Sequence, residues 1–133
     1  MEFSHEVTQI LQAYVYLYVD PRDNEIFYVG KGRGNRAFEH LSESSDKKKM
    51  ARIKSIQAAL LEPKIELLRY GLTDKEAELV EATAIDLLMD RGLTNETRGR
   101  ESLDFGRIPV SEIAAIYSAQ PVTISLPFAQ IWR

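Results

Sequence analysis

The sequence predicts an α+β domain with a small, mainly antiparallel sheet of three strands flanked by helices. Three observations carry this prediction. Apolar and aromatic residues alternate over residues 14–19, and a second apolar run follows a short polar turn at residues 26–30. A third run, over residues 64–72, is also typical of a strand. Residues 73–92 have apolar side chains at helical spacing instead.

The first two predicted strands form a hairpin over residues 14–30, and its two faces differ in chemistry. Alternation along a strand puts Tyr14, Tyr16 and Tyr18 on one face and the aliphatic residues between them on the other. Residues 20–25 contain a proline and an asparagine, which favour a turn. The chain therefore folds back, and phenols from both strands can share one surface.

The N-terminal half of the chain has three further segments with helical features. Residues 1–13 are consistent with a short leading helix or with a frayed tail. Residues 35–41 predict a short helix that Asn35 caps. Residues 46–61 have apolar side chains at helical spacing with the lysines opposite, and Pro63 ends this helix.

The helix predicted after the third strand has the clearest boundaries. Thr73 and Glu76 fit a capping box, in which each side chain bonds to the backbone N–H of the other residue. Gly92 is suited to end the helix. Residues 111–119 predict a last helix, and residues 122–132 are apolar enough for one or two strands.

Length and composition indicate one domain over residues 1–133. With 44% hydrophobic and 28% charged residues, the chain has the composition of a globular protein and not of a disordered one. No run of 18 apolar residues is present, so we expect no membrane span. The absence of cysteine excludes disulfides, thiolate zinc sites and cysteine nucleophiles, and it fits a cytoplasmic location.

Charge is divided unevenly along the chain. The formal net charge of −3 by itself argues against a polyanionic partner. Residues 31–54, however, carry eight basic against three acidic side chains, and residues 62–104 carry six against eleven. A basic lobe beside an acidic lobe suits a protein that holds a phosphate backbone and a divalent cation together. For Lys47, Lys48 and Lys49 alone, nucleic-acid contact and a solvated helix face are equally consistent with the sequence.

A glycine-rich basic segment follows the second strand. Gly30, Gly32 and Gly34 alternate with Lys31 and Arg33, and glycines let backbone N–H groups approach an anion closely. The segment lacks the spacing of a nucleotide-binding P-loop and does not match the dinucleotide fingerprint. A phosphate cradle is one interpretation, and a tight turn is the other.

Taken in order, several short motifs resemble those of the GIY-YIG nuclease superfamily. They are Tyr14-Val15-Tyr16, then Tyr28-Val29-Gly30 after eleven intervening residues, then Arg36, His40, Glu81 and Asn95. Residues 27–36 resemble the branch that includes the LEM-domain nucleases and related uncharacterised bacterial proteins. The resemblance covers residues 14–98 as a nuclease core. It departs from the family at Tyr14, where the first motif usually begins with glycine.

The resemblance implies a role for each matching residue. Glu81 would bind one Mg²⁺ or Mn²⁺ ion, and Arg36 would neutralise charge on the scissile phosphate. Tyr16 would be the general base for the attacking water, or Tyr28 if their roles are exchanged. A phenol needs a nearby cation to ionise near neutral pH, and Lys31 is the candidate.

Other residues have weaker assignments. For His40, a role in the active site and a position on the surface are equally consistent with the sequence. Asn95 would orient its neighbours. Tyr14 and Tyr18 are expected to be packing residues. Contacts with nucleic acid are expected from the basic side chains Lys31, Arg33, Arg36, Lys47, Lys48 and Lys49.

The predicted function is therefore a divalent-metal-dependent endonuclease that hydrolyses DNA phosphodiester bonds. Branched DNA and RNA stay open as substrates, and the oligomeric state is not indicated. The alternatives are a catalytically inactive nucleic-acid-binding module of the same fold, and a structural or regulatory domain of a longer protein. Residues 106–133 form a C-terminal extension for which the sequence indicates no role.

Overall fold

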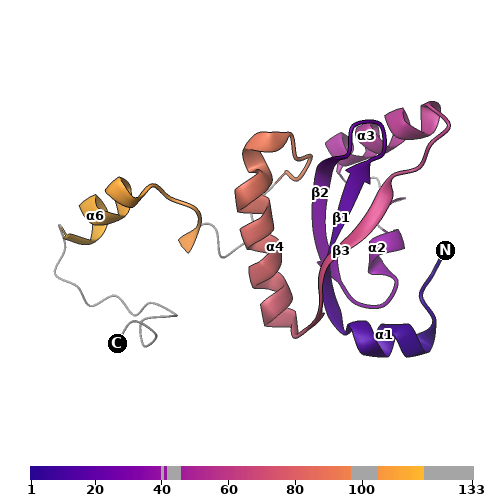
Figure 1. Ribbon diagram of the computed structural model, residues 1–133, viewed down its shortest axis with the longest axis horizontal. Coiled ribbons are helices and arrows are strands. Elements are labelled where there is room, and N and C mark those ends of the chain that lie inside the picture. The colour runs from indigo at the N-terminus through magenta and orange to yellow at the C-terminus, as the bar shows by residue number, and fades with distance from the viewer. Residues whose placement is uncertain (40, 42–45, 97–104, 119–133) are drawn as a thin grey trace.

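The computed structural model describes residues 1–39, 41, 46–96 and 105–118. Its sheet has the order β2-β1-β3, and both neighbouring pairs are antiparallel (Figure 1). The strands are β1 (Ala13–Asp20), β2 (Glu25–Gly32) and β3 (Lys64–Leu72). The predicted α+β fold with three antiparallel strands is confirmed. His40 and the strands predicted over residues 122–132 lie outside the described residues.

Helices occupy the predicted regions. They are α1 (His5–Leu11), α2 (Arg36–Glu39), α3 (Lys47–Ala58), α4 (Asp74–Leu88) followed by a 3-10 turn at Met89–Arg91, and α6 (Val110–Ser118). The leading segment is thus a helix and not a frayed tail. At α4 the capping box of Thr73 and Glu76 is present, and Gly92, with φ of 82°, follows the 3-10 turn. No helix in the described ranges is both long and apolar enough to cross a membrane.

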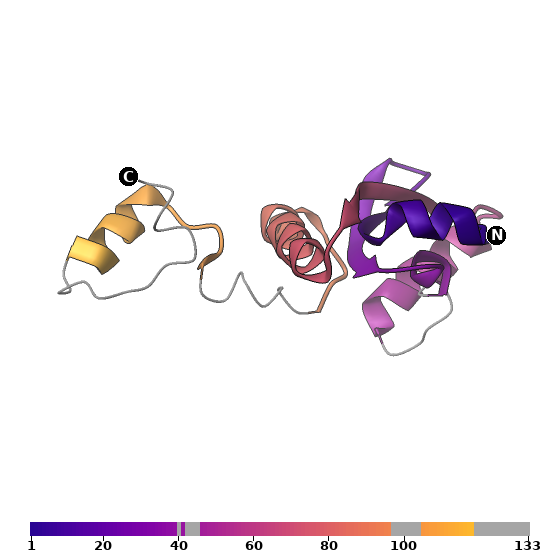
Figure 2. The ribbon, with the colours of Figure 1, turned by 90° about the horizontal axis from the view of Figure 1, so that it is seen from below.

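The central strand β1 is buried along its whole length, because helices cover both faces of the sheet. On one face α4 packs its Ala77, Ala84 and Ile85 against the aliphatic side chains of β1. α2 and α3 lie on the other face, opposite α4 (Figures 1 and 2), where Ala37, Ile53 and Ile56 pack with the tyrosines. The predicted division of the hairpin into an aliphatic and a tyrosine face is therefore present.

A β-bulge in the hairpin changes the alternation on β2. Tyr18 pairs with Tyr28, whereas Val19 pairs with Ile26, so Phe27 has no partner in the register. Phe27 and Tyr28 both pack in the tyrosine-side cluster, although consecutive strand residues normally point to opposite faces. Bulges re-aim side chains in this way and are common next to active sites.

The glycine-rich segment begins as strand and not as loop. The second strand continues through Gly32, which pairs with Tyr14, so the hairpin is longer than the predicted 14–30. Only then does the chain turn, at Gly34 with φ of 59°. The helix that follows is not capped by the side chain of Asn35 as predicted. Its Oδ1 instead accepts a hydrogen bond from the backbone N–H of Phe3 at 2.7 Å, which holds the N-terminal segment in place.

A buried carboxylate ties the hairpin turn to α3. Asp20 is 1% exposed, and its oxygens accept hydrogen bonds from Arg22 Nη2 and Arg52 Nε, both at 2.8 Å. The contacts with Arg22, the largest influence, and with Arg52 hold the pKa of Asp20 well below its usual range. Arg52 also reaches Asp23 at 3.3 Å. The helix is thereby held against the end of the hairpin.

Replacing Asp20 with asparagine should lower the free energy of unfolding by about 1–3 kcal/mol at pH 7, because charge-assisted hydrogen bonds are lost. Since the pKa is depressed in the folded state, this stabilisation is present above the unfolded value of about 3.9 and is lost as pH falls below it. Urea denaturation at pH 7 and pH 3 measures both effects. If the free energies of unfolding of the parent and Asp20→Asn differ by the same amount at both pH values, the depressed pKa of Asp20 does not contribute to stability.

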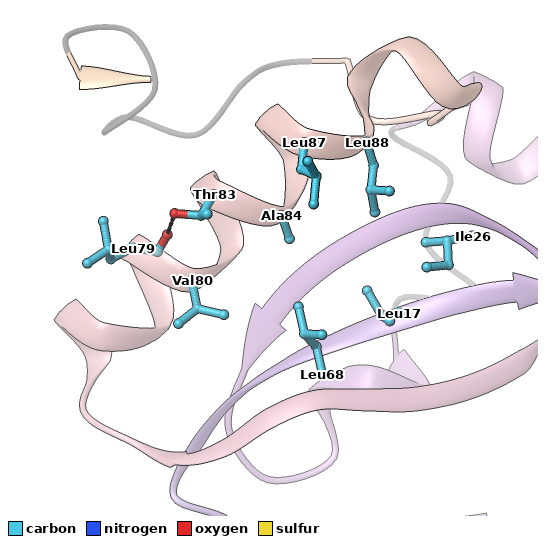
Figure 3. A pocket seen from close by; sticks show the side chains of 9 residues that line it. All are labelled: Leu17, Ile26, Leu68, Leu79, Val80, Thr83, Ala84, Leu87 and Leu88. Carbon is cyan, nitrogen blue, oxygen red and sulfur yellow. Dashed lines mark hydrogen bonds between the residues drawn. The ribbon is translucent and has the colours of Figure 1, made fainter. Parts of the chain in front are cut away.

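An apolar groove of about 490 Å³ lies between α4 and the sheet (Figure 3). Leu79, Val80 and Leu87 line it from the helix, and Leu17 and Leu68 line it from the strands. Its lining contains no ionisable side chain, so it offers no group for acid–base or phosphate chemistry. The candidate site must therefore be sought outside this groove.

Candidate active site

Tyr16 and Tyr28 lie on neighbouring strands with their ring centroids 6.2 Å apart. Tyr16 is fully buried, and this burial raises its pKa far above the ordinary value. The pKa of Tyr28 is also raised, first by burial and then by the negative charges of Glu81 and Asp46. Arg36 and a hydrogen bond with the Tyr16 hydroxyl act in the opposite direction. Of the two phenols, Tyr28 is therefore the less deeply buried and the better placed to ionise.

Two glycines of β2 make room for the functional side chains. A Cβ at Gly30 would clash with the ring carbon and hydroxyl of Tyr16, and a Cβ at Gly32 would clash with the stem of Arg36. Both glycines belong to the strand, so they do not form a loop. Their role is to leave space for these two side chains. Any side chain at these two positions would displace Tyr16 or Arg36.

The other two tyrosines of β1 fix the segment that carries Arg36. The Tyr14 hydroxyl donates to the carbonyl of Gly34 at 2.7 Å and accepts from the backbone N–H of Ala37 at 3.1 Å. The Tyr18 hydroxyl donates to the Ala37 carbonyl at 2.5 Å. Arg36 lies between these anchored positions, and its side chain remains 45% exposed. Both tyrosines are fully buried, so the expectation that they are packing residues holds, with an added hydrogen-bonding role.

Asn95 pairs with the outer edge of β2 next to Tyr28. Its Oδ1 accepts from the backbone N–H of Val29 at 3.0 Å, and its Nδ2 donates to the Val29 carbonyl at 2.8 Å. Thr94 donates to the carbonyl of Phe27 through its backbone N–H at 2.7 Å and its hydroxyl at 2.8 Å. Through these contacts Thr94 and Asn95 bond to the free edge of the sheet. They hold the backbone of Phe27 and Val29, on either side of Tyr28.

Glu81 belongs to α4 and is partly buried. Desolvation raises the pKa of its carboxyl group, whereas the positive charge of Lys31 lowers it. Strand alternation and pairing with Val15 put Lys31 on the aliphatic face, away from Tyr16 and Tyr28. The cation predicted for a tyrosine therefore lies on the Glu81 side of the sheet.

The donor set at Glu81 fits a magnesium or manganese ion. Among the described residues no group of three or more His, Cys, Asp or Glu side chains could enclose a metal. Mg²⁺ keeps several of its waters and is commonly held by one or two carboxylates, so a single glutamate beside a phosphate suits it. A structural zinc ion, which needs four protein ligands, does not fit.

Comparison with known proteins agrees with this arrangement. The sequence profile of the LEM-3-like GIY-YIG domain matches residues 13–115. The chain belongs to this family. The match includes the tyrosine-bearing hairpin, α2, α4 and most of α6, and membership indicates a nuclease that acts on nucleic acid. No curated protein and no solved structure matches the chain.

The GIY-YIG domain carries part of its basic surface on α3. Lys47 and Lys48 are exposed, as a nucleic-acid contact requires. Arg33 is also exposed, and its Nε contacts the Asp74 carboxylate at 2.8 Å, which links the residue after β2 to the start of α4. Surface pairs of this kind contribute little stability, so Arg33 remains available to a phosphate.

Lys49 differs from its two neighbours because it is buried. The prediction that all three lysines face outward is therefore wrong for Lys49. Its side chain is 3% exposed, and Nζ lies 4.6 Å from the centroid of the Tyr28 ring. Lys49 precedes the buried Ile53 by four residues and Ile56 by seven, which places all three on one face of the helix. This spacing is the feature of the sequence that indicates the burial of Lys49. Asp46, whose charge acts on Tyr28, was also missed, because it precedes α3 and is distant from Tyr28 in sequence.

Proposed function

We propose that this GIY-YIG domain is a divalent-metal-dependent endonuclease that hydrolyses phosphodiester bonds in DNA. The observation that carries the proposal is the coupling of one phenol to two groups of opposite charge. The pKa of Tyr28 responds to the Glu81 carboxylate and to the Arg36 guanidinium. A base, a cation for the phosphate and a carboxylate for a metal would together supply what the hydrolysis of a phosphodiester needs.

We assign the general base to Tyr28 and a supporting role to Tyr16. Tyr28 is partly exposed, whereas Tyr16 has no access to solvent. The Tyr28 oxygen would take a proton from water as the water oxygen bonds to phosphorus and the bond to the leaving sugar oxygen breaks. The hydrogen bond with the Tyr16 hydroxyl, which lowers the pKa of Tyr28, would stabilise the phenolate before that transfer.

Arg36 and Glu81 supply the electrostatic part of the proposal. Arg36 has a planar donor fork at the surface, and it would bind the scissile phosphate and neutralise the charge that builds on it. Glu81 would hold the metal ion, and Lys31 would keep this partly buried carboxyl group ionised. A bound Mg²⁺ ion supplies charge neutralisation at the phosphate and the leaving oxygen.

Cleavage assays test the proposed function. Supercoiled plasmid and labelled linear, nicked, flapped and four-way DNA, with an RNA duplex alongside, would be incubated with Mg²⁺, Mn²⁺ or EDTA. We expect metal-dependent cutting of at least one DNA substrate and none in EDTA. Binding without cutting in every lane would favour an inactive nucleic-acid-binding module, for which the raised pKa values of both phenols are the supporting observation.

Replacing Lys47 and Lys48 with alanine should weaken DNA binding and flatten its dependence on salt. Each phosphate contact releases counterions, so loss of two contacts should reduce the slope of log K against log [salt] by roughly 1–2. Fluorescence anisotropy at several salt concentrations measures the slope. Lys75→Ala, an exposed lysine at the start of α4, is the control. A double variant with the parental slope would show that α3 faces away from DNA.

A further inference from the structure

Lys49 is a buried lysine beside the proposed base. Lysine is almost never fully buried unless its charge is paired, because desolvation of an ammonium group is costly. Lys49 is 3% exposed on the inner face of α3, with Nζ 4.6 Å from the ring centroid of Tyr28. A cation is therefore held inside the tyrosine-side cluster, in contact with the ring of the proposed base.

The helix that carries Lys49 is capped at its start and tied to the hairpin turn one turn further along. Asp46 caps α3 by accepting a hydrogen bond from the backbone N–H of Lys49 at 3.1 Å. One turn further along, Arg52 donates to Asp20 at 2.8 Å and lies 5.4 Å from the centroid of the Phe27 ring. Two of the five cations of α3, Lys49 and Arg52, therefore lie over the two consecutive aromatic rings that the β-bulge directs to this side of the sheet. Contacts of this kind, when desolvated, are among the stronger cation–π interactions.

We propose that Lys49 is a positioning residue for the nuclease reaction, which holds the ring of Tyr28, and with it the hydroxyl group, in the orientation needed to reach the attacking water. The inference rests on the proposed function. In this proposal the cation beside the tyrosine base is Lys49, which lies on the tyrosine face. Lys31 lies on the aliphatic face and acts on Glu81 instead.

Three variants separate this role from a structural or DNA-binding role. Lys49→Met keeps the length of the side chain and removes the charge, Lys49→Arg keeps the charge, and Lys54→Met removes an exposed charge from the same helix. Single-turnover cleavage with protein in excess gives the rate of the bound complex, anisotropy gives the affinity for DNA, and circular dichroism shows whether each variant is folded at the assay temperature.

We expect Lys49→Met to bind DNA like the parent and to cleave it roughly 10–100-fold more slowly, since small misplacements of a catalytic group have effects of this size. Lys49→Arg should recover part of the rate, and Lys54→Met should cleave like the parent. If Lys49→Met does not fold, Lys49→Gln replaces it in the comparison with Lys49→Arg.

Two results would overturn the role of Lys49 alone: a parental single-turnover rate in the uncharged variant, or a loss confined to DNA affinity, which would make Lys49 a phosphate contact. A parent protein that cleaves no substrate with any metal would instead overturn the proposed function, and the role of Lys49 with it.

Discussion

Replacing Tyr28 with phenylalanine should lower the single-turnover rate of DNA cleavage by about 10²–10⁴-fold, the usual contribution of a general base. The ring and its packing against β1 and α3 are retained, so the variant should fold and bind DNA. The parental rate should also rise with pH into the alkaline range, because only the phenolate accepts a proton and the pKa of Tyr28 lies above its ordinary value of about 10. Rates measured from pH 6 to pH 10 test both statements.

Tyr16→Phe is the matched control for this prediction. It removes a buried hydroxyl that supports Tyr28, so the rate should fall less than in Tyr28→Phe, and the rise with pH should move to higher pH because the hydrogen bond that lowers the pKa of Tyr28 is lost. If Tyr28→Phe cleaves normally and Tyr16→Phe does not, the base is assigned to the wrong strand. If both cleave normally, the tyrosine mechanism is wrong and His40 becomes the next candidate.

Replacing Glu81 with glutamine should abolish metal-dependent cleavage and leave DNA affinity almost unchanged. The amide has nearly the same shape but cannot supply the anionic oxygen that a hard cation prefers. Binding of Mn²⁺, followed by electron paramagnetic resonance without DNA, should be lost as well. Glu78→Gln, on the preceding turn of α4, is the control and should retain both cleavage and Mn²⁺ binding.

The affinity of the parent for Mn²⁺ should fall as the pH is lowered. The pKa of Glu81 is raised by burial, so protonation competes with the metal at a higher pH than it would at an exposed glutamate. Affinity should therefore decrease between pH 7 and pH 5. Undiminished Mn²⁺ binding by Glu81→Gln would place the metal at another carboxylate.

Those parts of the fold that local chemistry determines were predictable. Alternation predicts the division of β1 into a tyrosine face and an aliphatic face, and this division is present. The capping box at Thr73 is a pattern of two residues whose side chains bond only to each other's backbone, so it needs no knowledge of the remaining fold. The third strand was predicted over Lys64–Leu72 and has those bounds.

Contacts between elements distant in sequence were not predictable from the same patterns. The glycine-rich segment suggests a loop, yet Gly30 and Gly32 serve as space for Tyr16 and Arg36, which approach from another strand and from the following helix. The bulge at Phe27 depends on pairing with β1, and no turn residue marks it. Lys49 lies within a run of lysines, which usually indicates an exposed helix face. Its spacing of four residues from Ile53 indicates instead that its side chain points inward.

The central claim is that Tyr28, Arg36 and Glu81 form one hydrolytic site. It is tested most directly by the single-turnover rate, with Mg²⁺ and protein in excess, on a DNA substrate that the parent, Tyr28→Phe and Glu81→Gln all bind. At equal occupancy we predict cleavage by the parent, a rate at least about 10²-fold lower for Tyr28→Phe, and no cleavage above the EDTA background for Glu81→Gln. Equal rates for the three proteins, or a parent that binds and never cuts, would contradict the claim.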